Sequence, residues 1–539
     1  MKSIPRVVGC MCALASAVVL AQGRGGGEWT TSGYDAQRTA WIRSDARLTK
    51  QAVQKGEFQF LWKAKFDNDA RQLNSLTEPI LLDRLIGFRG FKALAFIGGS
   101  DDRVFAIDTD LGRPYWTTVL NYSANTGGQP APSRDCPGGL IATPTRRTTL
   151  APSAFGVGGF GGARGVRTGS AVGEPGKGAA VLSQMPASRG AAPPPASREG
   201  GGRVAAVPFG GVDPVYAMAT DGMLHTLASS NGADQEPPVE FLPASARPSS
   251  LIWIDGTVYT TTSNECGAAP NAVWAIDLTA KEKQPVVWKT GGASVAGTTG
   301  VALGFQGDVY VALGAKASKS ASGARSGEAP DADAVVVLDS HTLAVKDWFG
   351  APGADFNTSP IVIHDKDREY IAVAGNDGKL YLLDGKSVGG SDHKTPLYVT
   401  PKYTAAGAGG ALATWENDGT RWILAPSVGA TLAAAKFTAN GPAPDGAIVA
   451  FKLVDQGGKT ALEPAWASRD LTSPLGPVVV NGLVIAASSG EYRPTSGHPT
   501  ASQRAQRSLP AVLYVLDGLT GKELWSSGKT ITSFARGGL

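Results

Sequence analysis

The chain has 539 residues, including 70 glycines and 35 prolines, a composition that favours frequent turns over long helices. Its 50 basic residues nearly balance its 46 acidic residues, and no basic cluster is dense enough for nucleic acid, which we exclude as a partner. Short runs of Val, Ile, Leu and Tyr lie between Gly, Asp and Asn, and this pattern predicts many short strands.

Residues 1–21 have the pattern of a secretory signal peptide. Two basic residues precede an apolar core that ends near Ala21, where small residues favour cleavage. This core is shorter than the ~20 apolar residues that a membrane-spanning helix needs, and no later segment is apolar enough to span. We therefore expect a periplasmic or extracellular protein without a transmembrane segment. An entry segment, 22–57, then precedes one repeated domain, 58–539.

One pattern recurs along that domain: an apolar strand, an Asp, a turn with Gly, and a second strand with an aromatic residue. Its best copies are "VFAIDTDLGRPYW" (104–116) and "AVLYVLDGLTGKELW" (511–525). Apart from one longer gap, the Asp position returns roughly every 45–70 residues, which suits a propeller blade with loop insertions. The residues that anchor the repeat are Asp108, Trp116, Asp277, Trp288, Asp339, Trp348, Asp384, Trp466, Asp517 and Trp525.

The anchor residues have expected mechanical roles. The Asp side chain can accept hydrogen bonds from the amides of the turn that follows it. The Trp is large enough to wedge between neighbouring sheets. Further apolar runs precede each copy, so each unit has four strands, and one such sheet cannot bury both of its faces alone. We predict an all-β fold, a β-propeller of four-stranded antiparallel blades; a β-sandwich of unrelated hairpins is the alternative.

The two ends of the repeated domain predict how the ring closes. "FQFLWKAKF" (58–66) resembles an outer strand that carries Trp62, and "TITSFARGGL" (530–539) resembles the approach to an inner strand. Because joining strands from both ends removes an exposed sheet edge, we predict seven complete blades and an incomplete eighth that the N- and C-termini share. The sequence stops before the two middle strands of that blade. A seven-bladed ring is the alternative.

Loops interrupt the repeat at several points. Residues 151–202 are rich in Gly, Ala and Pro and poor in apolar bulk, so we predict a disordered insertion within blade two. Shorter insertions at 315–332, 430–446 and 490–510 fall in the turn between the second and third strands. This turn lies at the same end of a blade as the loop that enters the innermost strand. We therefore expect these insertions to enlarge one face around the channel.

Two cysteines remain after signal cleavage. Cys136 precedes the inner strand of blade two, and Cys266 lies in the second-to-third-strand turn of blade three. Both positions belong to the loop-rich face of neighbouring blades. We predict a disulfide between them, because cysteines of exported proteins are commonly oxidised. Two free thiols are the alternative.

The repeat resembles the pyrroloquinoline-quinone (PQQ) type of propeller repeat, which occurs in quinoprotein dehydrogenases and in non-enzymatic relatives. "WTTSGYDAQRTAWIRSDARLT" (29–49) is similar to the entry segment of those dehydrogenases. For an enzyme, the resemblance implies PQQ and Ca²⁺ in the channel mouth. The adjacent cysteines that often lie under the quinone are absent from this sequence, and no C-x-x-C-H haem motif occurs.

The resemblance does not place the metal ligands of the family residue by residue, and no catalytic residue is assigned. Glu78, Asn264, Asn357 and Arg536 lie near predicted inner-strand entries or face loops, so they are candidates for contact with a cofactor in the channel. The competing interpretation is that all four are exposed polar residues of loops.

Three functions remain after these observations. We favour a binding or scaffold module that contacts a protein partner or a small ligand through its loop-rich channel face. The cofactor is left unassigned, with PQQ and Ca²⁺ possible but not favoured. The alternative is a PQQ- and Ca²⁺-dependent quinoprotein dehydrogenase that oxidises alcohols or sugars, so enzymatic activity stays open. A propeller adaptor of outer-membrane assembly is a third hypothesis, which the poor placement of a lipoprotein-box-like run at 7–10 disfavours. We expect a monomer.

Overall fold

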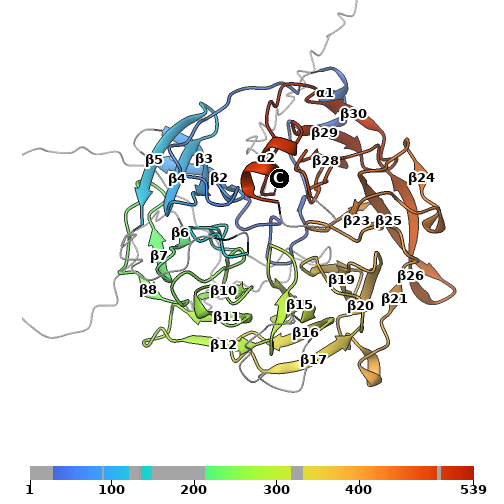
Figure 1. Ribbon diagram of the computed structural model, residues 1–539, viewed down its shortest axis with the longest axis horizontal. Helices are drawn as coiled ribbons and strands as arrows, with labels where there is room; N and C mark the ends of the chain where they lie inside the picture. Colours follow the sequence, from blue (N-terminus) through green and yellow to red (C-terminus); the bar gives the residue numbers. More distant parts are fainter. Residues whose placement is uncertain are drawn as a thin grey trace, which may run out of the picture. The chain divides into compact units, whose positions relative to one another are not determined.

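Seven separate β-sheets surround a central channel in the computed structural model (Figure 1). The structure describes residues 28–56, 58–87, 90–120, 133, 135–148, 213–316, 330, 332–493 and 499–538. The predicted signal peptide, 1–21, and the predicted insertion, 151–202, lie outside this part of the chain. Residues 149–212, which include that insertion, are likewise outside the described residues.

The first three sheets follow the chain from the N-terminal side. One contains β2 (Ile80–Gly87), β3 (Gly90–Gly98), β4 (Arg103–Asp108) and β5 (Arg113–Val119). The next contains β6 (Val215–Met218), β7 (Met223–Leu227) and β8 (Val239–Glu240). The third contains β9 (Ile252–Ile254), β10 (Thr257–Thr262), β11 (Ala272–Asp277) and β12 (Pro285–Lys289).

Two further sheets continue around the ring. The fourth contains β13 (Ala293–Val295), β14 (Ala302–Leu303), β15 (Asp308–Lys316), β16 (Ala334–Asp339) and β17 (Val345–Gly350). The fifth contains β18 (Ile361–Asp365), β19 (Arg368–Ala374), β20 (Leu380–Asp384) and β21 (Tyr398–Val399).

The last two sheets each carry one additional short strand. The sixth contains β22 (Ala413–Asn417), β23 (Thr420–Val428), β25 (Gly446–Gln456) and β26 (Lys459–Ala467), with β24 (Thr438–Ala439) parallel to β26. The seventh contains β27 (Val478–Val480), β28 (Leu483–Ser488), β29 (Val512–Asp517) and β30 (Glu523–Ser526), with β1 (Trp41–Ile42) parallel to β27. The two α-helices are α1 (Lys50–Gln54) and α2 (Ala501–Arg507).

The predicted all-β propeller is confirmed, and the ring has seven sheets, as in the alternative form of the prediction. Successive strands of a sheet pair antiparallel, so each blade is a meander. The middle strands are buried on both faces because each sheet packs between two neighbours. All six residues of β10 are buried, for example. Such strands have continuous apolar runs instead of the alternation that a sheet with one wet face would show.

Each anchor aspartate ends the third strand of its sheet and binds the turn that follows. In the seventh sheet, Asp517 Oδ1 accepts hydrogen bonds from the amides of Leu519 (3.1 Å) and Thr520 (2.9 Å). In the fourth sheet, Asp339 Oδ1 accepts from the Thr342 amide (2.9 Å) and hydroxyl (2.8 Å). These bonds to the charged carboxylate hold the pKa of Asp339 below its usual 3.8.

The anchor tryptophans lie on the outer strands, and Trp116 and Trp466 lean on the next sheet. Trp466 of β26 lies opposite Ala450, and its indole Nε1 donates to the Gly518 carbonyl of the seventh sheet (3.0 Å). Its ring lies so close to Gly521 that no β-carbon would fit there. Trp116 of β5 likewise donates to the Ser229 carbonyl of the second sheet (2.9 Å). The indoles therefore lie between blades, as the repeat predicts.

The segments 58–66 and 530–538 contain no strand in the described chain, so the incomplete eighth blade of the prediction is not formed. Trp62 nevertheless docks as an anchor does, because its Nε1 donates to the Thr109 carbonyl (2.9 Å) and its ring lies on Gly112. Burial alternates along 61–68, as in a strand. The segment thus covers one face of the first sheet without joining any sheet.

Residues 29–40, which we call the plug, cross one end of the channel. Hydrogen bonds join the plug to every sheet, at its innermost strand or at a segment beside that strand, through Leu81, Arg146, Leu251, Leu303, Val362, Thr414 and Val479. Arg38 at its centre is 2% exposed and donates to the carbonyls of Thr299 and Val301. The part of the entry segment that the structure describes therefore ties the seven blades together from inside the ring.

Candidate functional site

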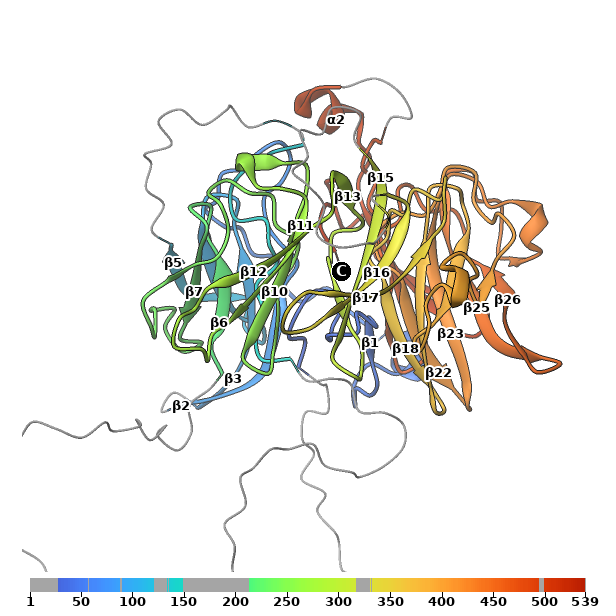
Figure 2. The ribbon, with the colours of Figure 1, turned by 90° about the horizontal axis from the view of Figure 1, so that it is seen from below.

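A cavity of about 930 Å³ lies in the channel, bounded on one side by the plug. Figure 2 shows α2 at one end of the ring and β1, which directly follows the plug, toward the opposite end. The wall comes from the loops that enter the innermost strands of six sheets, at 73–78, 137–143, 247–249, 295–299, 410–411 and 475–478. Many separate segments therefore converge on one cavity of the size that binds small molecules.

Glu78 lies at the plug side of the cavity. The Ser32 hydroxyl of the plug donates to its carboxylate, and the Glu78 carbonyl accepts from Thr77 Oγ1 (3.1 Å). Burial raises the pKa of Glu78, although Ser32 and the Arg38 guanidinium oppose the shift. Burial also lowers the pKa of Arg38, to about 9. The cavity wall beside the plug therefore contains a buried carboxyl whose pKa is raised.

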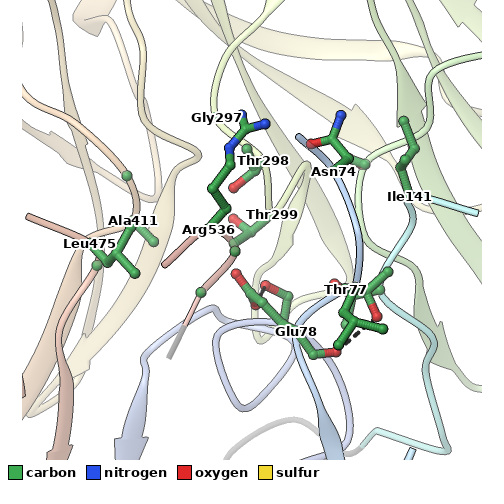
Figure 3. A pocket seen from close by; sticks show the side chains of 18 of the residues that line it. Asn74, Thr77, Glu78, Ile141, Gly297, Thr298, Thr299, Ala411, Leu475 and Arg536 are labelled. Carbon is green, nitrogen blue, oxygen red and sulfur yellow. Dashed lines mark hydrogen bonds between the residues drawn. The ribbon is translucent and has the colours of Figure 1, made fainter. Parts of the chain in front are cut away.

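Arg536 enters the same cavity from the C-terminal side. Figure 3 shows its side chain between Leu475 on one side and Glu78 on the other. Its Nε lies 3.2 Å from Glu491 Oε1, and its Nη1 donates to the Gln72 carbonyl (3.3 Å). Residues 533–538 line the cavity around it, so the last described residues form part of the site.

Glu491 is the buried centre of an arginine cluster. Its side chain is 2% exposed and forms ion pairs with Arg493 (3.4 Å), Arg504 of α2 and Arg536 (3.2 Å). Burial lowers the pKa of Arg536, and the charges of Arg504, Arg493 and Arg247 lower it further, while Glu491 opposes them. Positive charge thus exceeds negative charge at this end of the cavity.

The other two candidates of the sequence lie elsewhere. The Asn264 side-chain amide donates to the Asp135 carbonyl (3.0 Å), and Asn357 donates to the Ala408 carbonyl. Neither residue is part of the cavity lining. The structure therefore brings Glu78 and Arg536 together and leaves Asn264 and Asn357 apart from them.

The predicted disulfide is present beside the cavity. Cys136 and Cys266 are joined with a Cα–Cα distance of 5.5 Å, and Pro137, which follows Cys136, lines the cavity. Asn264, two residues before Cys266, binds the chain next to this bond. The disulfide therefore fixes the loop of the second blade to the third blade at the cavity wall.

The sequence interpretation missed Arg247, Glu491, Arg493 and Arg504. Three of these residues belong to the insertion 490–510, which was expected on the channel face, so that expectation could have identified them. Arg247 directly precedes the inner strand of the third sheet. Of the other insertions, 430–446 contains β24 and packs beside the outer strand β26 instead of the channel. Most of 315–332 lies outside the described residues.

The donors in the cavity do not fit a calcium-bound quinone. No group of three or more His, Cys, Asp or Glu side chains within the described ranges could hold a metal ion. Of the two lining glutamates, Glu78 has a raised pKa and Glu491 is bound by arginines. Among the described residues, no helix is long and apolar enough to cross a membrane.

Comparison with known proteins identifies the fold and not the family. No protein-family model and no curated protein sequence matches the chain. The chain is similar to a quinohemoprotein alcohol dehydrogenase from Pseudomonas putida HK5, with a TM-score of 0.55 and 13% identity over 95% of this chain and 73% of the other. It is also similar to a europium-containing methanol dehydrogenase, with a TM-score of 0.53 and 11% identity over 95% of this chain and 87% of the other.

Proposed function

We propose that this chain is a binding module whose ligand is a small molecule held in the channel cavity. The observation that carries the proposal is the cavity itself, a volume of about 930 Å³ with walls from six blades and the plug at one end. Sites of this kind combine a mostly apolar wall with a few convergent polar groups. Here those groups are Glu78, Arg247, Glu491, Arg493 and Arg536.

The same proposal includes export of the protein. The sequence pattern of residues 1–21 is its basis, and the Cys136–Cys266 disulfide supports it, because such bonds persist in oxidising compartments. A binding module outside the cytoplasm would meet its ligand through the open face of the ring. Sequencing the N-terminus of the exported protein tests this point. Because cleavage near Ala21 is expected, the mature chain should begin at or near Gln22.

A quinoprotein dehydrogenase is the second candidate. Its support is the fold shared with two proteins named as alcohol and methanol dehydrogenases. Identities of 11–13% carry the fold alone, and the donor set of the cavity argues against calcium. The binding function is therefore favoured, and the quinone is retained as a probe in its test.

Isothermal titration calorimetry on the full chain tests the binding function. The probes are succinate, citrate, pyrophosphate, glucose, methanol, and PQQ with Ca²⁺. We expect at least one probe to bind once per chain with a Kd below about 1 mM. Thr298→Trp places an indole in the cavity and should abolish that binding, whereas Lys459→Trp, at the exposed hairpin between β25 and β26, should not.

Two outcomes would reject the binding function. Failure of every probe to bind is one, and equal affinity of the native chain and Thr298→Trp is the other. Uptake of PQQ with Ca²⁺, followed by reduction of a dye in the presence of methanol, would instead favour the dehydrogenase. Thermal melts of both variants establish that the ring is intact before any titration is compared.

A further inference from the structure

Arg247 is a partly buried cation that contacts no counter-ion among the described residues. It lines the cavity, and within the part of the chain that the structure describes its guanidinium has no hydrogen-bond or ion-pair partner. Burial lowers its pKa, and the nearby charge of Asp135 offsets only part of that shift. A guanidinium removed from water without a partner carries a desolvation cost. A ligand that supplies an anionic group would remove that cost.

Arg493 extends the same cationic surface. Its side chain is 40% exposed and contacts Glu491 through Nε at 3.4 Å, so its terminal nitrogens remain available to the cavity. Glu491 also serves Arg504 and Arg536. One carboxylate therefore faces three arginines, and it cannot neutralise Arg247 as well.

The charged side chains that line the cavity are unevenly divided between the two signs. Glu78 lies at the plug, where its carboxylate accepts a hydrogen bond from the Ser32 hydroxyl. Arg247, Arg493 and Arg536 line the same cavity, and the second lining carboxylate, Glu491, already pairs with two of them. A ligand that enters this cavity therefore meets more guanidinium groups than carboxylates.

We propose that the cavity binds a small molecule with at least two negative charges, held by Arg247 and Arg493. This inference rests on the proposed function, of which it names the ligand class. Carboxylates and phosphates both match the forked N–H groups of arginine, which bind two oxygens at once. Two guanidinium groups from different blades would each take one anionic group. Neutral alcohols and sugars offer neither charge.

Titration with a charged and a neutral molecule of the same shape tests the charge requirement. Succinate, citrate and pyrophosphate are the charged probes, and succinamide replaces the two carboxylates of succinate by amides. We expect at least one charged probe to bind, with an affinity that falls as ionic strength rises, and succinamide to bind at least tenfold more weakly. Succinate and pyrophosphate distinguish a carboxylate ligand from a phosphate ligand.

Arg247→Gln tests the residue assignment. Because this side chain has no partner among the described residues, its replacement should not lower the melting temperature, whereas it should weaken binding of the anion about tenfold or more. Arg247→Lys keeps the positive charge but lacks the forked N–H groups. Its affinity for the anion should lie between those of the native chain and Arg247→Gln. Arg47→Gln, an exposed residue of the entry segment, is the matched control and should bind as the native chain does.

The results separate this inference from the proposed function. Equal binding of succinamide and succinate, or an unchanged affinity of Arg247→Gln, would overturn the anion proposal. If glucose or methanol binds and Thr298→Trp abolishes it while no charged probe binds, the binding function stands and the anion proposal falls. If no probe of either kind binds, both are rejected.

Discussion

Two interfaces between neighbouring sheets, which we call seams, contain the same kind of tryptophan contact. In one the tryptophan belongs to a strand, and in the other it belongs to a segment without a strand. At the seam between the sixth and seventh sheets, Trp466 is 1% exposed and belongs to the β26 ladder. At the seam between the seventh and first sheets, Trp62 makes the equivalent contact from a segment that joins no sheet. Both indoles donate to a carbonyl in the turn after the anchor Asp and lie on a glycine of that turn. The docking contact therefore does not require a blade.

The difference lies in what surrounds each indole. Trp466 packs in an apolar cluster that includes Trp415, Ile448 and Tyr514 from two sheets. Trp62 is only half-buried, and its neighbours Phe60 and Leu61 are 65% and 82% exposed. We expect the seam at Trp466 to contribute more to the free energy of unfolding than the seam at Trp62.

The largest effect is expected from Trp466→Ala. Removing a fully buried indole leaves a cavity between two sheets and an unsatisfied Gly518 carbonyl, a loss of about 3–5 kcal/mol in the free energy of unfolding. Urea denaturation followed by circular dichroism measures this loss. A loss below about 1 kcal/mol would show that the indole does not hold this seam.

Trp62→Ala should cost less, about 1–2 kcal/mol, because the indole is half-buried and only one hydrogen bond is lost. The same urea denaturation applies. If this variant loses as much as Trp466→Ala, the two seams are equivalent and the comparison fails.

Asp517→Asn tests the turn on which Trp466 leans. Burial alone would raise the pKa of Asp517, but hydrogen bonds from Lys50 and Thr520 prevail and hold that pKa below 3.8. A carboxyl with a lowered pKa stabilises the fold above its unfolded pKa and loses this contribution as pH falls through the lower folded value. The variant should therefore be less stable than the native chain at pH 7. The difference should vanish as the pH falls below 3.8, in melts recorded across that range.

The smallest effect is expected from Leu61→Ser at the open seam. Its side chain is 82% exposed, so its loss should change the free energy of unfolding by less than about 0.5 kcal/mol. Val484→Ser, at a fully buried position of β28, is the matched contrast and should cost several times more. A large loss from Leu61→Ser would mean that the segment 58–66 covers more apolar surface than the structure indicates.

Local sequence was sufficient to predict the blades because each repeat contains the residues that form its turn and its contact with the next sheet. An Asp that binds its turn and a Trp that leans on the next turn need only neighbours in the chain and one adjacent sheet. The closure was harder to predict. Trp62 has the sequence of an outer strand, but a strand needs a partner ladder, and none forms at 58–66. The prediction of an eighth blade treated an indole contact as evidence for a sheet.

The candidate site depends on contacts between distant segments. Glu78 and Arg536 could be named from their places near strand entries, although 458 positions separate them. The same reasoning named Asn264 and Asn357, which bind nearby carbonyls instead. A polar residue in a loop can either line the cavity or bind a nearby carbonyl, because the direction of its side chain depends on which residues the ring places opposite it.

By itself, the sequence determined the all-β class, the repeat, the turn chemistry and the pairing of Cys136 with Cys266, since these follow from patterns within or between neighbouring repeats. Only the tertiary structure decided the number of blades, the path of residues 29–40 through the channel, and the placement of Arg247, Glu491 and Arg536 around one cavity. Ring closure is a property of all sheets together, and the cavity exists only where six of them converge. No local pattern in the sequence specifies which distant loops meet around the cavity.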